Sequence, residues 1–393
     1  MSRFDSIFQK SLAQRKNSGI FRQALPAHPA TVTHAARLHD FRSNDYLGLS
    51  HHKKLASRAA LWAQEYGSGA GASRLVSGTL AAHELVESKL AALKFTESAL
   101  LFPSGFQANI GVLSALLNLS MEATGEAPSI YMDRLNHASL HLACNAAGVR
   151  QKRFRHNDVN HLQDLLKRDT TSKGLRFIVT ESVFSMDGDR APLEDLRLLA
   201  DRYDAFLYID DAHATGILGE AGCGLASVVK PDLILGTCGK AMGSMGAFIA
   251  VSQTLRDWVI NHCTSFIYST AIAPPILGAI DAALDLLPDM TAERENVAAM
   301  AACLRQKLHE AGLATGDSST QIVPFMIGDN EAALEIAARL RKGNIYATAI
   351  RPPTVPSHTA RLRLALHAGL TREDVLTCAE KLIEIHDDVI GTR

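Results

Sequence analysis

The sequence has few cysteines and no pattern that would join them. Six cysteines are spread over 393 residues, from position 144 to position 378, and no CxxC pair occurs. This spacing excludes a disulfide framework and argues against a structural zinc site. We therefore expect reduced, mostly buried thiols and no bound metal.

A strong charge of one sign and a long apolar run are also missing. Lys and Arg total 40 against 41 for Asp and Glu, which gives a formal net charge of -1. This balance excludes a protein built around a strong field for nucleic acid or an anionic membrane. No apolar run approaches the roughly 20 residues that a membrane-spanning helix needs. The first 19 residues carry charges throughout and lack the apolar core of a signal peptide, so we expect a cytoplasmic protein.

The sequence has the composition of a globular protein, and strand-like runs alternate with helical patterns along it. Hydrophobic residues make up 47% and charged residues 21%, which is too apolar for disorder. Short β-rich runs alternate with helical patterns or turns at 129–133, 176–183, 205–211, 232–237 and 246–251. Such alternation predicts the α/β class with a largely parallel sheet covered by helices.

The order of predicted elements changes after Pro274-Pro275, where helical segments precede two strand-like runs, QIVPFMIG and RLRLAL. We predict an N-terminal segment at 1–50, a large domain at 51–275 and a smaller α+β domain at 276–393. The first 40 residues are predicted to form a helix followed by a loop that contains Pro and His.

The run FLYIDDAHATG (206–216) ends a predicted strand in two carboxylates, with His213 three residues after Asp210. Ligands of open α/β sheets bind beyond the carboxyl ends of the strands. A buried carboxylate costs several kcal/mol unless a cationic partner is present. A protonated pyridine nitrogen would be such a partner; a capping or salt-bridged Asp is the equally open alternative.

The run LILGTCGKAMGSMGAFIA (233–250) places Lys240 in a glycine-rich turn between two apolar strands. Most lysines lie on solvated faces, whereas an amine in a restricted pocket can form a Schiff base. A plain surface turn is the alternative. The apolar flanks argue against it, because they place the turn at the rim of the sheet.

Three further segments are ambiguous on their own. In PSGFQAN (103–109), Ser104 and Gly105 begin a predicted helix that would suit a phosphate, although ordinary serine capping is favoured. His137 is a ligand, a stacking ring or, as favoured from the motif alone, a helix-start residue. The glycine-rich loop at 67–78 follows a helical pattern rather than a strand, which excludes a dinucleotide fingerprint.

Together these segments resemble the α-oxoamine synthase family of fold-type I pyridoxal-phosphate enzymes, whose fold is aspartate aminotransferase-like. The resemblance covers nearly the whole chain and depends on the joint order of the motifs, which include SNDYLGLSHH (43–52), TESVFSMDGDRAPL (180–193), GTCGKAMG (236–243) and AIRPPTVPSHTARLRLAL (349–366). The FSMDGD and IRPPTVP runs point to the branch of the family that serves biotin biosynthesis.

The resemblance implies a site for pyridoxal 5'-phosphate (PLP) in the large domain. Lys240 would hold the cofactor, and Asp210 would pair with its pyridinium nitrogen so that the ring accepts electrons. His213 would lie near the phenolic oxygen, and His137 would stack on the ring. The implied phosphate site consists of Gly105, Phe106, Ser185, Thr237 and Thr270.

The resemblance also implies a homodimer with shared sites, because Thr270 would reach the phosphate from the partner subunit. Arg361 would clamp the amino-acid carboxylate through paired hydrogen bonds. Asn44 and Arg22 are further substrate-binding candidates, and Tyr46 lies in the same motif as Asn44.

The implied reaction is the decarboxylative condensation of L-alanine with a pimeloyl thioester of CoA or acyl-carrier protein. Other members of the family stay open: glycine C-acetyltransferase, 5-aminolevulinate synthase, serine palmitoyltransferase or an autoinducer synthase. A non-catalytic binding protein of the same fold is a further alternative, against which the intact set of Lys240, Asp210, His213 and Arg361 argues.

Three departures from the family pattern leave the acyl-chain preference open. Cys238 stands where the family commonly has Phe, residues 117–129 resemble an insertion, and Ser73-Arg74 occupy variable positions of the glycine-rich loop. Each departure either shifts that preference or reflects drift.

Overall fold

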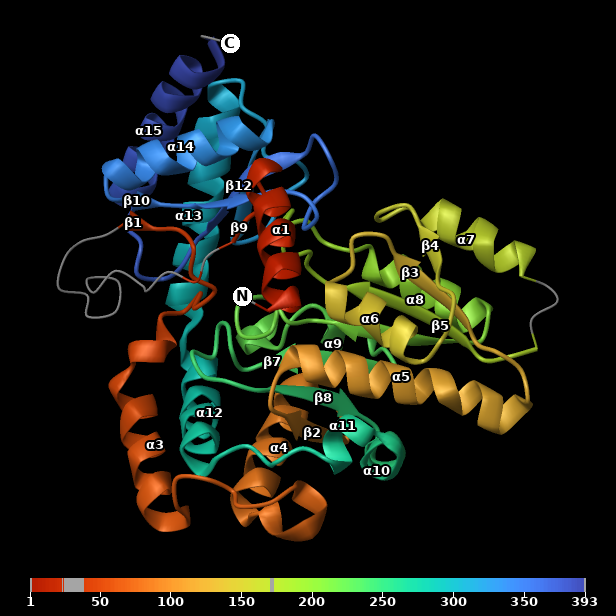
Figure 1. The fold of residues 1–393 in the computed structure, drawn as a ribbon. Coiled ribbons are helices and arrows are strands. Elements are labelled where there is room, and N and C mark those ends of the chain that lie inside the picture. Colours follow the sequence, from red (N-terminus) through yellow and green to blue (C-terminus); the bar gives the residue numbers. More distant parts are fainter. Residues whose placement is uncertain (1, 23, 25–38, 170–172, 392–393) are drawn as a thin grey trace. The chain divides into compact units, whose positions relative to one another are not determined.

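A computed structural model of the protein describes residues 2–22, 24, 39–169 and 173–391 (Figure 1). These residues form two compact units. The larger unit comprises the described residues of Asn44–Ser185 and Arg190–Glu295, and the smaller unit comprises those of Met1–Ser43, Met186–Asp189 and Asn296–Arg393. Among the described residues, no helix is long and apolar enough to cross a membrane.

The larger unit is built on a seven-stranded sheet. Its strand order is β2 (Ser98–Phe102), β8 (Ala247–Val251), β7 (Leu233–Thr237), β6 (Ala205–Asp210), β5 (Arg176–Glu181), β3 (Ser129–Asp133) and β4 (Lys152–Phe154). The strands from β7 to β4 pair in parallel, and β8 pairs antiparallel with both β7 and β2. Every residue of β2, β3, β7 and β8 is buried, which explains why these strands are apolar on both faces. The predicted mostly parallel α/β sheet is confirmed.

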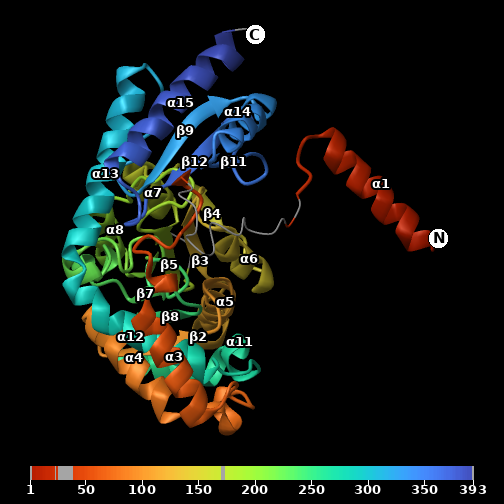
Figure 2. The ribbon, with the colours of Figure 1, turned by 90° about the vertical axis from the view of Figure 1, so that its left-hand side faces the viewer.

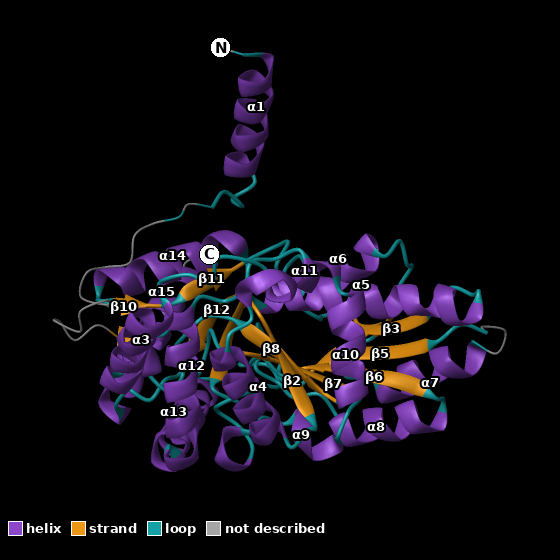
Figure 3. Cartoon of the chain, turned by 90° about the horizontal axis from the view of Figure 1, so that it is seen from below, coloured by secondary structure: helices purple, strands orange, loops and turns teal. Residues whose placement is uncertain are grey.

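Helices cover both faces of this sheet, with α5 and α6 on one side and α8 and α9 on the other (Figure 3). The helices of the larger unit are α3 (Lys53–Tyr66), α4 (Ala81–Lys94), α5 (Gly105–Thr124), α6 (Ala138–Ala146), α7 (Val159–Arg168), α8 (Leu193–Arg202), α9 (Ala226–Val229), α10 (Gln253–His262), α11 (Thr264–Ile267) and α12 (Pro274–Leu286). Its short helical turns are η1 (Leu49–His51), η2 (Arg74–Gly78), η3 (Glu220–Gly222) and η4 (Leu287–Asp289). One core cluster joins α5 to the strands and includes Leu113, Leu117, Leu235 and Ile249.

The smaller unit contains two small sheets. Strands β11 (Thr348–Ile350), β12 (Ala360–Ala365) and β9 (Ile322–Gly328) form an antiparallel sheet, while β1 (His39–Asp40) pairs in parallel with β10 (Ile345–Tyr346). Helix α14 (Asn330–Lys342) packs against the three-stranded sheet and against α15 (Arg372–Gly391) (Figure 2). The remaining helices are α1 (Arg3–Asn17) and α13 (Thr291–Glu310), which begins in the larger unit.

The division into units differs from the predicted domain boundaries at 50/51 and 275/276. Helix α12 belongs to the larger unit because it packs against α3 and α4. Its fully buried Asp281 is held by Arg58 of α3 and Lys89 of α4. A charged cluster that joins distant segments leaves no signal in the local pattern of the sequence.

Other differences are local. The sequence analysis did not predict strand β4, whose three residues are half-buried, exposed and buried in turn, and the strand predicted at 176–183 ends at Glu181. The N-terminal helix is present as α1, whereas the predicted loop after it falls largely outside the described residues. The insertion-like stretch at 117–129 mostly extends α5. All six cysteines are free and five are buried, as predicted.

Candidate active site

The candidate site lies where three neighbouring strands of the larger unit end. Strands β5, β6 and β7 run in parallel and terminate at Glu181, Asp210 and Thr237. Glu181 and Asp210 are register partners, so their side chains emerge at the same edge of the sheet. The expectation that polar residues at strand ends mark the site is consistent with this convergence.

The Asp210 carboxylate is held in a fixed orientation. The side chain is 6% exposed. Its Oδ1 accepts the amide of Ala212 at 3.0 Å, and its Oδ2 accepts Nδ2 of Asn109 at 2.8 Å. A carboxylate has about four acceptor positions, so these two donors leave capacity for a further one.

Asn109 is a member of the site that the sequence analysis quoted within a motif but did not assign. It is buried on α5, and its side chain donates to Ser139 Oγ as well as to Asp210. Its Oδ1 accepts the hydroxyl of Tyr208 at 2.8 Å. This acceptor contact fixes the amide orientation, so that the NH2 group faces Asp210. The sequence contains one signal for Asn109, because this residue stands one helical turn after the predicted phosphate-binding residues.

His137 occupies the N-cap of α6, as the helix-start interpretation predicted. Its Nδ1 contacts Ser139 Oγ at 2.7 Å, and its ring meets Phe106 edge-on with centroids 6.4 Å apart. The residue is exposed to solvent. Burial against the protein and the positive charge of Lys240 lower the pKa of His137, and the negative charge of Asp210 offsets this in part. This net lowering of the pKa favours the uncharged imidazole, which suits a stacking ring.

Lys240 lies half-buried in the turn between β7 and β8. Gly243 closes this turn with φ +61°, and a Cβ there would meet the amide of Ser50 at 2.2 Å. Gly216, with φ +86°, brings the segment after Asp210 against Ala241 in the same way. The glycines thus allow two segments that are distant in the sequence to pack against the turn that carries Lys240.

The predicted phosphate-binding residues occupy three elements of the larger unit. Ser104 caps α5, with its Oγ accepting from Gln107 N, as the capping interpretation predicted. The amides of Gly105 and Phe106 follow in the first turn, where a helix leaves its donors without intrahelical acceptors. Thr237 ends β7 with its Oγ donating to Gly246 O, and Ser185 lies in the turn after β5.

His213 belongs to a hydrogen-bonded chain that reaches the SNDYLG motif. Its Nδ1 lies 2.7 Å from the hydroxyl of the fully buried Tyr46, and that hydroxyl lies 3.3 Å from Asn44 Oδ1. The structure therefore brings together two predicted site residues, Asn44 and His213, through Tyr46.

Glu181 is a buried residue that the sequence analysis quoted without a role. Its carboxyl accepts the backbone amide of His137. Burial and the neighbouring negative charge of Asp210 raise the pKa of Glu181 well above its usual range, against the opposing effect of Lys240. A charged residue at the end of a buried apolar strand is the same signal that singled out Asp210.

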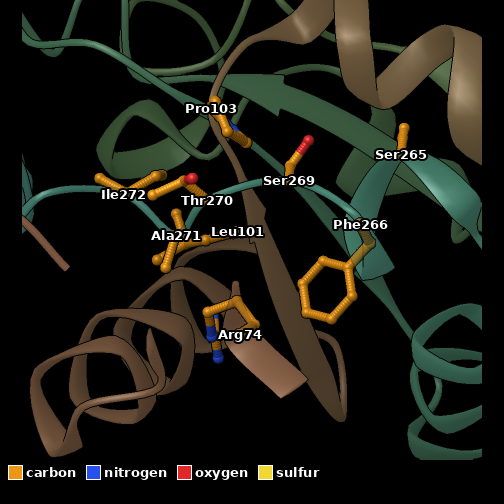
Figure 4. A pocket seen from close by; sticks show the side chains of 9 residues that line it. All are labelled: Arg74, Leu101, Pro103, Ser265, Phe266, Ser269, Thr270, Ala271 and Ile272. Atoms are coloured by element: carbon orange, nitrogen blue, oxygen red, sulfur yellow. The ribbon is translucent and has the colours of Figure 1, made fainter. Parts of the chain in front are cut away.

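Thr270 lies on the surface of the larger unit, in an isolated β-bridge with Ser73 of the glycine-rich loop. Figure 4 shows it at the rim of a small pocket with Ser269, Ser265 and Arg74. Arg74 donates to Glu87 through two hydrogen bonds.

Arg361 and Arg22 belong to the smaller unit. Arg361 is 4% exposed on β12, donates through Nε to Thr359 O at 3.0 Å and forms an ion pair with Asp187. Arg22 is exposed and donates to Thr354 Oγ at 3.0 Å. Each arginine therefore has a polar partner within its own unit.

The donor set at the strand ends fits PLP. A half-buried amine, a fixed carboxylate, a neutral imidazole and a helix N-terminus with adjacent hydroxyls occur on the elements of one unit. Among the described residues, no cluster of His, Cys, Asp and Glu could hold a metal ion.

The chain belongs to the aminotransferase class I and II family, whose model matches residues 37–382. It is 52% identical to the 8-amino-7-oxononanoate synthase of Gluconacetobacter diazotrophicus over 94% of each chain. It is 54% identical to a putative 8-amino-7-oxononanoate synthase of Bordetella bronchiseptica, again over 94% of each chain.

The fold is also shared with solved structures. A structure of SPT with its PLP internal aldimine superimposes with a TM-score of 0.82 at 27% identity, covering 89% of this chain and 87% of the other. The comparisons confirm the predicted α-oxoamine synthase family, fold type I and PLP as the cofactor. The protein is a PLP-dependent acyltransferase of this family.

Proposed function

We propose that the protein condenses L-alanine with a pimeloyl thioester and releases carbon dioxide, giving 8-amino-7-oxononanoate for biotin biosynthesis. The observation that carries this proposal is the fixed Asp210 carboxylate beside the turn of Lys240, at one edge of the sheet. The names of the relatives, at 52% and 54% identity over nearly the full chain, supply the substrates.

The proposed roles follow from the chemistry of each group. Bound PLP supplies an aldehyde that reacts with amines and a ring that accepts electrons. Lys240 would hold that aldehyde and, once displaced by the amino acid, take up the proton from its Cα. Asp210 would keep the ring nitrogen protonated, and His213 would donate to the phenolic oxygen. His137 would cover one ring face.

The remaining candidates would position the reactants. Gly105 and Phe106 would offer backbone amides to the phosphate, with the hydroxyls of Ser185 and Thr237 beside them. Arg361 would bind the amino-acid carboxylate, which must compete with Asp187 for the guanidinium. Asn44 and Arg22 are proposed as further substrate contacts.

We also propose a homodimer in which Thr270 of each chain completes the partner's phosphate site. Support comes from exposed apolar side chains near the Ser73–Thr270 bridge, where Val76 is 80% and Tyr268 is 82% exposed. Surfaces of this kind mark association sites more often than free solvent-facing surface. A cytoplasmic location is proposed as well.

A turnover assay with product mass as the readout tests the function. The protein is supplied with L-alanine, glycine or L-serine, each with pimeloyl, acetyl, succinyl or palmitoyl thioesters of CoA and of acyl-carrier protein. We expect 8-amino-7-oxononanoate from L-alanine and a pimeloyl thioester. Product from another combination at a higher rate would overturn the proposed substrates and select a different member of the family.

The variant Lys240→Ala tests the site itself, with the exposed Lys167→Ala as the matched control. We expect no turnover and no borohydride-fixed cofactor peptide from Lys240→Ala, and both from the control. Turnover by Lys240→Ala, or fixation of the cofactor at another lysine, would refute the proposed site. Absence of any bound chromophore in the unaltered protein would favour the non-catalytic binding protein.

A further inference from the structure

Two buried carboxyl groups meet at the strand edge, and only one of them has a proposed role. Glu181 ends β5 and Asp210 ends β6, and the two are direct register partners. Their side chains are 3% and 6% exposed. Like charges at paired positions of a buried strand edge repel each other, which favours a state in which only one of the two groups is ionised.

Their hydrogen bonds indicate which of the two carries the charge. Asp210 accepts two donors, one from a side chain and one from the backbone. Glu181 accepts the backbone amide of His137 through Oε1. A carboxylate that accepts several donors is stabilised as the anion, whereas one amide is also satisfied by a neutral acid.

The amide that Glu181 accepts is at the head of a helix. His137 is the N-cap of α6, and its ring is oriented by Ser139. A hydrogen bond to the His137 amide therefore fixes the backbone from which this ring projects.

The charged groups around Glu181 agree with a neutral side chain. Burial has the largest effect on its pKa, and Asp210 and Asp133 raise it further. Lys240 and the bond from the His137 amide act in the opposite direction without reversing it.

We propose that Glu181 is a positioning residue, which anchors the His137 backbone as an uncharged hydrogen-bonding group and leaves Asp210 as the negative charge of the site. The hydrogen bond from the His137 amide to Glu181 lies within this chain and needs no cofactor. Only its consequence for the cofactor, the placement of the His137 ring, rests on the proposed function.

The pair of variants Glu181→Gln and Glu181→Ala tests the proposal. Gln keeps an acceptor for the His137 amide and has no charge, whereas Ala removes the acceptor. The exposed Glu194→Gln, at the start of α8, is the matched control. His137 is followed by NMR in full-length protein labelled at histidine Cε1, with His137→Gln used to assign its resonance. PLP affinity and turnover are measured in parallel.

We expect the His137 resonance and its titration to be retained in Glu181→Gln and displaced in Glu181→Ala. PLP affinity and kcat/KM should stay within about threefold in the first variant and fall about 10-fold to 100-fold in the second. Infrared difference spectra between Glu181→Gln and the unaltered protein at pH 7 should show the loss of a carboxylic-acid C=O band rather than a carboxylate band.

Two results would overturn the proposal. A carboxylate band lost in Glu181→Gln would show that Glu181 is ionised. An unmoved His137 resonance in Glu181→Ala would show that the carboxyl anchors nothing. If Glu181→Ala does not fold, the infrared band and the NMR titration of Glu181→Gln still test the proposal. Neither readout needs substrate, so failure of the proposed condensation reaction would be recognised separately.

Discussion

Lys94 and Asp211 form an ion pair of 2.6 Å in which neither side chain has any exposed area. Lys94 Nζ also donates to Thr215 Oγ at 2.7 Å and to the carbonyl of Cys223 at 2.6 Å. Asp211 Oδ1 accepts the hydroxyl of Ser182 at 2.6 Å. Because Asp211 directly follows Asp210, this pair fixes the backbone that presents the site carboxylate.

We predict that Lys94→Met destabilises the protein by about 3–5 kcal/mol, because it leaves the Asp211 carboxylate buried without a counter-charge. The free energy of unfolding is measured by urea titration, with the exposed Lys167→Met as the control. Adding Asp211→Asn should recover part of the loss, since the amide oxygen still accepts the Leu225 and Ala226 amides. A loss below about 1 kcal/mol would contradict this reading of the pair.

A second prediction concerns the donor to Asp210. Asn109→Ala should lower kcat/KM about 10-fold to 100-fold, the equivalent of about 1–3 kcal/mol for a buried group left without its partner. Asn109→Asp should lower it further, because a like charge then faces Asp210. Tyr208→Phe, which removes only the hydroxyl that orients Asn109, should cost less than either. Equal activity of Asn109→Asp and the unaltered protein would rule out the proposed charge on Asp210.

The third prediction separates charge from geometry at the carboxylate clamp. Arg361→Lys keeps the positive charge and loses the planar fork, so we expect the KM for L-alanine to rise about 10-fold to 100-fold, with a smaller change in kcat. Arg363→Lys is the matched control, because it makes the same change two residues further along β12. Comparable KM values for the two variants would remove Arg361 from the amino-acid site.

A fourth prediction concerns pH and stability. Burial, with the positive charge of Arg74 adding to it, lowers the pKa of His83 to about 4. The unfolded chain binds a proton on this imidazole near pH 6.5, whereas the folded chain binds it only near pH 4. Unfolding therefore takes up a proton between these values, and the contribution of His83 to stability is complete above pH 6.5 and lost as the pH falls.

The comparison of the unaltered protein with His83→Gln isolates this effect. Gln at this position of α4 keeps a side-chain acceptor for the Leu80 amide, which His83 Nδ1 now accepts at 3.1 Å. The stability difference between the two proteins should shift by up to about 3 kcal/mol between pH 7 and pH 4, in favour of the variant at low pH. Parallel stability curves for the two proteins over this range would contradict the lowered pKa.

The sequence predicted most of the larger unit's elements because their patterns are local. The apolar runs of β3, β6 and β7 are bounded by turn residues and lie between helical patterns, so period and length alone indicate buried parallel strands. The predicted boundary at 275/276 falls in the first turn of α12, whereas the division into units lies at Glu295/Asn296. Helix α12 joins the larger unit through Asp281, whose partners lie about 190 and 220 positions earlier in the chain. Strand β4 was not predicted because three residues are too few to show the hydrophobic alternation of a strand.

For the site, the order of motifs in the sequence was sufficient to identify the family and to single out Lys240 and Asp210, since these residues stand at strand ends that local patterns reveal. The tertiary structure alone decided what holds them. Asn109 orients Asp210, Tyr46 meets His213, and Glu181 anchors His137, each across a long separation in the chain. Such contacts exist only when the sheet brings its strand ends to one edge, because hydrogen bonds act over about 3 Å and sequence distance does not enter them.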